Sequence, residues 1–141
     1  MNTEEISITP QPPQLVVPVE DQPFWDALNA GTLVLARCPC GAYYARSQAC
    51  LRCGATAQTL MWVPASGRGT VRTFVVFDKP YHPYFKERTP YVVAVVALAE
   101  GPELTTNVVD VDVSAVEIGM PVRIVISERG GNKIHQASAK V

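Results

Sequence analysis

The chain has 141 residues, which is enough for one ordinary domain or two very small ones. Its formal net charge of −1 argues against nucleic acid or an anionic membrane as the main partner, because both require a broad positive field. Acidic residues stand where a signal peptide has a basic start, and no apolar run is long enough to span a membrane, so a cytoplasmic protein without a membrane partner is expected.

The N-terminal part of the chain predicts an extended arm followed by a short helix. Residues 1–20 contain four prolines and few large apolar groups, which is typical of an extended segment. Residues 22–30 then predict a helix, because Asp21 can act as N-cap, Pro23 fits the first turn and Gly31 fits the end. The β-prone sequence TLVLAR follows and leads into the first cysteine.

The segment ARCPCGAYYARSQACLRCGA, residues 36–55, holds all four cysteines as two close pairs. Two such pairs can supply the four thiolates of a structural zinc site, and thiols in a reducing compartment favour metal over disulfides. Gly41 and Gly54 directly follow the two pairs and tolerate the backbone conformation of a tight reversal around a metal. The expected zinc ligands are Cys38, Cys40, Cys50 and Cys53.

Three alternatives remain open for this cluster: iron in a rubredoxin-like site, buried free thiols, or two disulfides. The first pair has one intervening residue and the second has two, so the amide-to-sulfur hydrogen bonds of the first turn should differ and Cys38 should bind less well. A closed site of four thiolates leaves no position for water or substrate. A metal held there is therefore expected to stabilise the fold and not to catalyse a reaction.

Beyond the cysteines the sequence predicts mainly strands. The β-rich runs are LMWVPASGRGTVRTFVVF, PYVVAVVALAE, ELTTNVVDV and PVRIVISE, with RGGNK as a hairpin turn before a short strand near IHQAS. One helical turn is expected within residues 112–119, capped by Asp112 or Ser114. Because one strand is apolar on both faces, these elements predict a mainly β protein with a five-stranded OB-like barrel.

No complete catalytic set is visible outside the cysteines. His82 in a loop and His135 in the final expected strand are interpreted as surface or packing residues. The sequence has no Gly-x-Ser-x-Gly and no P-loop, and SGRGT lacks the third glycine of a dinucleotide fingerprint. We therefore expect no catalytic residue in this chain.

The loop FDKPYHPYFKERTPY, residues 77–91, combines proline, aromatic side chains and cations between two strands. One interpretation is that the aromatic side chains simply cover an end of the barrel. The other is a partner interface beside an anionic ligand such as a phosphorylated cofactor. The residues concerned are Tyr81, Tyr84 and Phe85 for the interface and Lys79, Lys86 and Arg88 for the anion.

The order of these parts resembles the DUF35 family, whose members join a rubredoxin-like zinc ribbon to a C-terminal OB-fold. The matching segments are FWDALNAGTLVLARC, CGAYYARSQACLRCGA, VPASGRGTVRTFVVF, PYVVAVVALAEGPELTTNVV and IGMPVRIVI. After the arm at 1–20, the resemblance implies a helix and zinc ribbon at 21–62 and the barrel at 63–141. Family members usually have Cys-x-x-Cys in both turns, so Cys38-Pro39-Cys40 is a departure.

The resemblance also implies a function. DUF35 proteins are non-catalytic auxiliary subunits of thiolase-like enzymes that cleave or form C–C bonds in acyl-CoA, for example in steroid side-chain or aromatic degradation. We expect such a partner here, and a MaoC-type hydratase would be a separate chain. On this basis Phe24 and Trp25 join the interface candidates, and Arg68 joins the cations expected near the CoA phosphates. The alternative for Phe24 and Trp25 is packing of the helix against the ribbon.

Two functions from other classes remain. A single-stranded nucleic-acid binder can also combine a ribbon with an OB barrel, and its main contact candidates are Arg72, Phe74 and Arg123. A rubredoxin-like electron carrier would hold iron in the cysteine site. Salt-dependent binding to an oligonucleotide would support the first, and a coloured, reversibly reducible protein would support the second.

Overall fold

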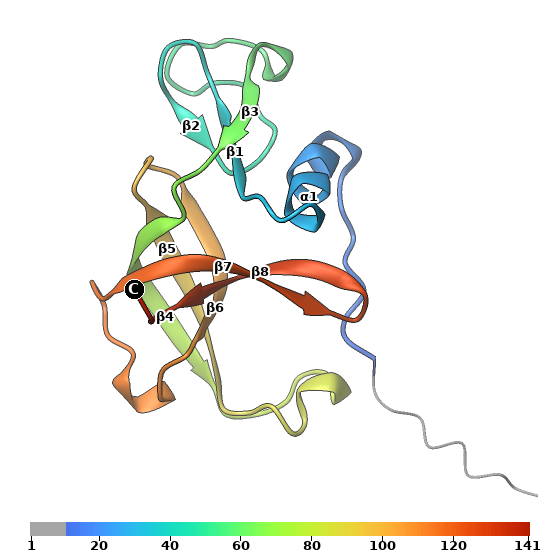
Figure 1. Ribbon diagram of the computed structural model, residues 1–141, viewed down its shortest axis with the longest axis vertical. Coiled ribbons are helices and arrows are strands. Elements are labelled where there is room, and N and C mark those ends of the chain that lie inside the picture. Colours follow the sequence, from blue (N-terminus) through green and yellow to red (C-terminus); the bar gives the residue numbers. More distant parts are fainter. Residues whose placement is uncertain (1–10) are drawn as a thin grey trace, which may run out of the picture.

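The computed structural model describes residues 11–141, so half of the expected arm, residues 1–10, lies outside the described part (Figure 1). Residues 11–18 form neither helix nor strand and lead to the 3-10 turn η1 (Val19–Asp21). A small ribbon stands on a closed barrel, and helix α1 (Gln22–Asn29) packs at the side where the two meet (Figure 1). Within the described residues, no helix is long and apolar enough to cross a membrane.

The ribbon is a three-stranded antiparallel sheet with the order β2-β1-β3. Its strands are β1 (Val34–Arg37), β2 (Tyr43–Tyr44) and β3 (Met61–Pro64), and the 3-10 turn η2 (Ala57–Thr59) precedes β3. The buried cluster of the ribbon is small and consists of Ala36, Cys38, Cys50 and Leu60. A unit with so few buried side chains needs a staple in addition to its apolar contacts.

The barrel consists of five strands in the closed order β4-β5-β6-β8-β7. All neighbouring strands are antiparallel except β6 and β8, which run parallel. The strands are β4 (Arg68–Phe77), β5 (Tyr91–Leu98), β6 (Glu103–Val109), β7 (Pro121–Arg129) and β8 (Asn132–Ser138), with the 3-10 turn η3 (Pro83–Phe85) between β4 and β5.

The helical turn expected near residue 112 is η4 (Val113–Ala115), and the Asp112 carboxylate accepts a hydrogen bond from the Ser114 amide at 2.9 Å. It lies between the third and fourth strands of the barrel, as in an OB-fold. The predicted fold class is confirmed: a mainly β chain with a short N-terminal helix, a cysteine cluster and a five-stranded OB-fold barrel. The domain boundaries themselves stay predictions.

Helix α1 links the ribbon to the barrel through one aromatic side chain. Phe24 is 4% exposed, and its ring centroid lies 6.3 Å from that of Trp62 in β3 and 6.1 Å from that of His135 in β8. At the end of the helix, the Asn29 side chain accepts a hydrogen bond from the Lys133 amide at 3.1 Å. Phe24 thus lies inside the chain and packs the helix, which agrees with the alternative interpretation given to it above.

His135 is half-buried at this junction. Its Nδ1 lies 2.8 Å from the hydroxyl oxygen of Thr106, and its ring stacks on Trp25 at a centroid distance of 5.7 Å. Burial lowers the pKa of His135 to about 4, so the ring is neutral at physiological pH. An unfolded chain would protonate the same residue near its ordinary pKa of 6.5.

We expect the free energy of unfolding to fall as the pH drops from about 6.5 to about 4, because in this range only the unfolded chain binds the extra proton. Between pH 7 and pH 5, wild type should lose about 2 kcal/mol more than His135→Phe, as measured by urea unfolding. His82→Phe, in the loop, is the matched control. The same loss of stability in wild type and His135→Phe would show that this histidine is not the group responsible.

Candidate metal centre and neighbouring surfaces

Four cysteine sulfur atoms meet in the turns of the ribbon. The Sγ atoms of Cys38, Cys40, Cys50 and Cys53 lie within 4.8 Å of one another. Two of the separations are 3.5 Å, between Cys38 and Cys53, and 3.6 Å, between Cys40 and Cys50. A tetrahedral metal site with sulfur bonds near 2.3 Å requires separations of about 3.8 Å. The cluster is therefore close to the size of a site for one metal ion.

Two tight turns present these cysteines, and they differ in length by one residue. In each turn the first cysteine, Cys38 or Cys50, donates its amide to the carbonyl of the residue after the glycine, at 2.8 Å. The same cysteine accepts from the amide of Gly41 or Gly54, at 2.8 and 2.9 Å. Both glycines have positive φ, 97° and 77°, as the sequence predicts. The one-residue spacing therefore shortens the first turn without opening it.

The Cys50 sulfur receives several hydrogen bonds. The Tyr44 hydroxyl lies 3.3 Å from it and itself accepts from the Leu51 amide at 2.9 Å, which leaves the hydroxyl hydrogen available to a Cys50 thiolate. This bond, followed by the backbone N–H groups of Cys53 and Arg52, lowers the pKa of Cys50 to about 6. The second turn is thus prepared to hold a thiolate at neutral pH.

The Cys38 sulfur has a poorer set of donors. The backbone N–H of Cys40 lowers the pKa of Cys38, but burial and the neighbouring thiols together outweigh it and raise that pKa to about 12. This contrast matches the expectation that the shorter turn changes the amide-to-sulfur hydrogen bonds. Four crowded thiols cannot all ionise without a cation among them, so deprotonation of Cys38 is coupled to metal binding.

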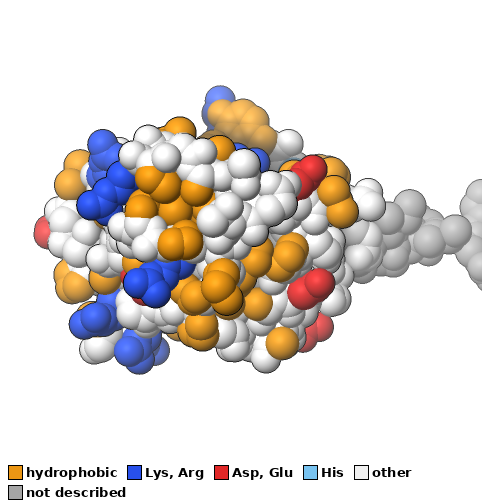
Figure 2. All heavy atoms as spheres, turned by 90° about the horizontal axis from the view of Figure 1, so that it is seen from above, with side chains coloured by type: hydrophobic (Ala, Val, Ile, Leu, Met, Phe, Trp, Pro, Cys, Tyr) orange, Lys and Arg blue, Asp and Glu red, His pale blue; other side chains and the backbone are white. Residues whose placement is uncertain are grey.

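The surface around this centre carries exposed apolar side chains beside arginines. Leu51 is 85% exposed and Met61 is 69% exposed, and Arg37 lies opposite Met61 in the β1–β3 pair. Figure 2, which looks onto the ribbon end, shows hydrophobic patches with Lys and Arg side chains beside them. Residues 27–77 contain five arginines and no Asp, Glu or Lys. Sequence reasoning missed this asymmetry, although a charge count along the chain reveals it.

The loop between β4 and β5 builds a row of rings at the far end of the barrel. We define the aromatic end as Phe77, Tyr81, Tyr84, Phe85 and Tyr91. Tyr91 stacks on Phe77 at 5.1 Å and on Phe85 at 4.9 Å. Tyr84 and Phe85 are half-buried, whereas Tyr81 is 78% exposed. Of the aromatic interface candidates in the loop, only Tyr81 is thus fully presented to solvent.

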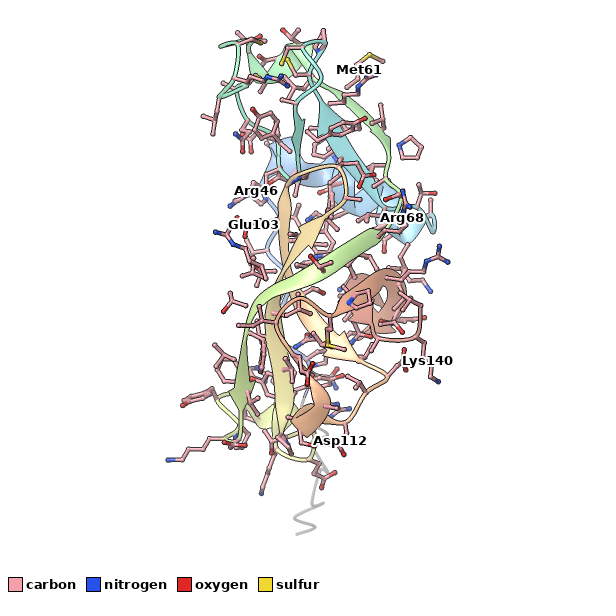
Figure 3. The ribbon with its side chains drawn as sticks, turned by 90° about the vertical axis from the view of Figure 1, so that its left-hand side faces the viewer. Arg46, Met61, Arg68, Glu103, Asp112 and Lys140 are labelled. Atoms are coloured by element: carbon pink, nitrogen blue, oxygen red, sulfur yellow. The ribbon has the colours of Figure 1, made fainter. Side chains whose placement is uncertain are left out.

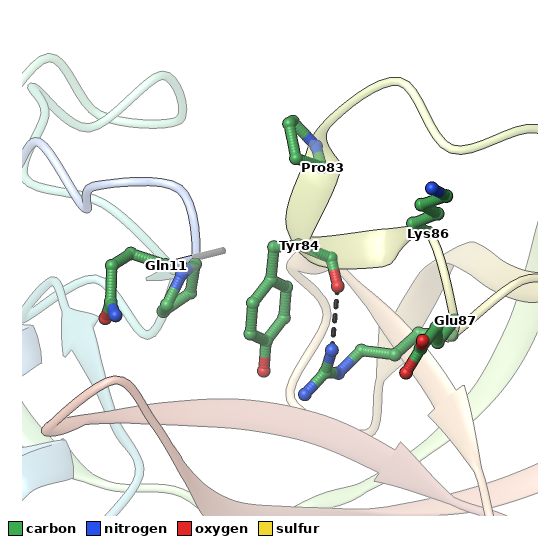
Figure 4. Close-up of a pocket in the computed structure, with 7 residues that line it drawn as sticks. Gln11, Pro83, Tyr84, Lys86 and Glu87 are labelled. Carbon is green, nitrogen blue, oxygen red and sulfur yellow. Dashed lines mark hydrogen bonds between the residues drawn. The ribbon is translucent and has the colours of Figure 1, made fainter. Parts of the chain in front are cut away.

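The cations expected near the CoA phosphates do not all lie together in the structure. A cavity of about 380 Å³ is lined by Lys86, Arg88 and Tyr84, among other residues (Figure 4). The Arg88 guanidinium carbon lies 3.8 Å from the centroid of the Tyr84 ring. Nη1 of Arg88 donates a hydrogen bond to the Tyr84 carbonyl at 2.7 Å. Lys79 is exposed in the same loop. Arg68 begins β4, about 30 Å along the strand from this loop, and so does not join the other cations (Figure 3).

Residues 62–127 match the family described as "ChsH2, C-terminal OB-fold domain". The chain is 39% identical over 107 residues to a Thermomonospora curvata protein named "Probable enoyl-CoA hydratase alpha subunit", covering 72% of this chain and 32% of that protein. It is 42% identical over 60 residues to a "DUF35 domain-containing scaffold protein" of Methanothermobacter thermautotrophicus, covering 43% of this chain and 44% of that one. The chain therefore spans less than half of each of these two relatives.

Among solved structures, one described as "Ltp2-ChsH2(DUF35) aldolase" is similar to this chain with a TM-score of 0.80 and 30% sequence identity. The match covers 91% of this chain and 100% of that chain. The similarity therefore extends over the ribbon, the helix and the barrel together, and not over the OB-fold alone.

We expect Tyr44→Phe to weaken metal binding about tenfold, because it removes the hydroxyl that donates to the Cys50 sulfur. Competition between the protein and a chromogenic chelator for Zn²⁺ measures the change. Tyr43→Phe is the matched control, since Tyr43 adjoins Tyr44 in β2 and its hydroxyl makes no hydrogen bond within the described residues. Unchanged affinity in Tyr44→Phe would show that this hydroxyl does not support the site.

Proposed function

Because this chain belongs to the DUF35 family, we propose that it is a non-catalytic auxiliary subunit that binds and stabilises a thiolase-like enzyme acting on acyl-CoA. The observation that carries the proposal is the similarity to "Ltp2-ChsH2(DUF35) aldolase" over 91% of the chain, because that description pairs a DUF35 protein with an aldolase. Aldolases break or form C–C bonds. The partner's reaction is accordingly C–C bond cleavage or formation in an acyl-CoA.

In this proposal the cysteine cluster holds one structural zinc ion. The donor set of four sulfur atoms fits Zn²⁺, and the two turns bring them to suitable separations. Zinc bound by Cys38, Cys40, Cys50 and Cys53 would supply metal–sulfur bonds that tie the two turns together. It leaves no position for a substrate, so its contribution is to the fold of the ribbon.

The outer face of the barrel beside the aromatic end supports a protein partner. Val75 on β4 is 58% exposed and lies opposite Val93 on β5. Val93 and Val95 alternate with the buried residues of β5 and are half-buried, so this strand is apolar on its outer face as well. Tyr81 adds an exposed ring. A contiguous apolar face with aromatic residues is characteristic of a protein interface, and we place the enzyme there.

The cations of the same loop border the acyl-CoA site of the complex. Lys79 and Lys86 are exposed, and Arg88 lies between the Tyr84 ring and solvent. Phosphate groups of CoA are bound by such cations through charge-assisted hydrogen bonds. Arg68 lies at the other end of β4 and has no part in this arrangement.

A separate hydratase chain is a second candidate partner. The relative named as a hydratase alpha subunit is about three times as long as its matching segment, which accounts for 32% of it. The name hydratase therefore belongs to a longer protein, and only about a third of that protein resembles this chain. A MaoC-type hydratase joining the complex would supply that activity in trans.

Nucleic-acid binding is less well supported by the contacts of its candidate residues. Arg72 Nη1 lies 2.6 Å from the Glu103 carboxylate, and Phe74 packs against the barrel core. Neither of these two side chains is thus positioned to contact a phosphate or a base. Absence of salt-dependent binding to an oligonucleotide would agree with the subunit function.

The first test is affinity purification of the tagged chain from its native host, with mass spectrometry and metal analysis of the same sample. We expect a thiolase-like chain to co-purify, and about one zinc per copy of this protein. Tyr81→Asp should reduce co-purification at least tenfold by placing a charge in the apolar interface. Ile118→Asp, at a 70% exposed position near η4, is the matched control. Elution of the wild-type chain alone would refute the proposal.

In the isolated complex, Lys79→Ala combined with Lys86→Ala should raise KM for the acyl-CoA substrate several-fold and leave kcat unchanged, because only binding of the phosphates is lost. Steady-state kinetics with a saturating range of acyl-CoA measure both constants. Arg68→Ala serves as the control, since Arg68 lies far from the loop. A drop in kcat without a change in KM would exclude a phosphate-binding role for these lysines.

A further inference from the structure

A second cavity, of about 340 Å³, lies where the ribbon, helix α1 and the barrel meet. Its walls include Phe24 and Trp25 of α1 and Leu104 of β6, and its rim includes Arg46 and Glu103. Figure 3 shows these two charged residues near each other at the level where ribbon and barrel join. Neither the metal centre nor the aromatic end uses this cavity. His135 is one of its polar lining residues.

The hydrogen bonds of His135 determine which ring nitrogen carries the proton. The Thr106 hydroxyl donates its single hydrogen to the His135 carbonyl at 2.9 Å. The same hydroxyl oxygen must therefore accept from Nδ1 of His135, 2.8 Å away. The neutral ring thus carries its hydrogen on Nδ1 and an unshared electron pair on Nε2.

The Nε2 atom is left without a partner inside the described part of the chain. Within residues 11–141, no buried side-chain nitrogen or oxygen is left unpaired. Nε2 is therefore accessible, and His135 lines the cavity. An acceptor beside apolar walls is stabilised when a donor from outside occupies the cavity.

The charges around the cavity are already compensated. The Asp21 carboxylate accepts from the Ser47 amide at 2.7 Å and lies 3.9 Å from Arg46 Nε. Glu103 is paired with Arg72 at 2.6 Å. A neutral ligand leaves both pairs in place. The cavity thus favours a neutral group that carries a hydrogen-bond donor.

We propose that this cavity binds a phenolic hydroxyl group, with the aromatic ring beside Phe24 and Trp25 and the hydroxyl donating to Nε2 of His135. A flat ring complements the aromatic wall, and a phenol is a stronger donor than an aliphatic alcohol because its pKa is about 10. The lowered pKa of His135 keeps the acceptor available at neutral pH. The phenolic group is a tyrosine side chain of a protein partner or a free phenol, and the site does not depend on the function proposed above.

The test compares p-cresol with 4-methylanisole, which has nearly the same shape but no hydroxyl hydrogen, on the full-length zinc-loaded protein at pH 7. We expect p-cresol to bind with a Kd on the order of 1 mM and 4-methylanisole to bind about tenfold more weakly. Side-chain ¹H–¹⁵N spectra of the two histidines report the contact, because Nε2 of His135 should shift while His82 serves as internal reference. Equal binding of both compounds, or p-cresol binding that leaves His135 unshifted, would overturn the proposal.

Two variants test whether the preference for p-cresol depends on the hydrogen bond to His135 or only on the shape of the cavity. His135→Phe keeps a flat ring and removes the acceptor, so the preference for p-cresol should disappear, whereas His82→Phe should retain it. A preference that persists in folded His135→Phe would also overturn the proposal. If His135→Phe does not fold, the two compounds on wild type still decide the question. N-acetyltyrosinamide then identifies the source: binding as tight as that of p-cresol supports a protein tyrosine, and its exclusion supports a free phenol.

Discussion

The ribbon depends on one constraint, the close approach of its four cysteine sulfur atoms. The ribbon has strands of two to four residues, and its own buried cluster has only four residues, of which two are the cysteines Cys38 and Cys50. Apolar burial on this scale does not offset the conformational entropy of ordering the chain. The barrel differs, because alternate residues of its long strands fill one continuous core. The two halves are thus held by different physical means.

Helix α1 makes these two halves one structure. At its start, the Asp21 carboxylate holds the Ser47 amide of the ribbon, and one turn later Phe24 lies between Trp62 of the ribbon and His135 of the barrel. The cavity at the junction takes walls from all three parts, since Ala45 belongs to the ribbon, Trp25 to the helix and Leu104 to the barrel. Loss of order in the ribbon would remove one of these walls. The metal centre and the cavity are therefore structurally linked, although they share no residue.

The fold was predictable to a large extent from local pattern. Paired cysteines followed by glycine, a proline in the first turn of a helix and β-branched runs between turns are signals carried by neighbouring residues. The closeness of the four thiols followed from the same pattern. Long-range relations were not predictable in this way. His135 meets Thr106 and Phe24 only because β8 pairs with β6 and packs on α1, and Arg68 is separated from Lys86 because β4 is ten residues long.

The position of β8 has a consequence for the order of folding during synthesis. Strand β8 (residues 132–138) lies between β6 and β7 and closes the barrel. Helix α1 packs against the same strand, although it is translated more than a hundred residues earlier. The ribbon sequence leaves the ribosome before the barrel strands, and its four cysteines can come together early because all four lie within residues 38–53. The barrel stays open until β8 emerges, and before then α1 can contact only the ribbon, through Asp21 and Phe24. A nascent chain of this protein can thus complete the two cysteine turns of the ribbon before the barrel closes.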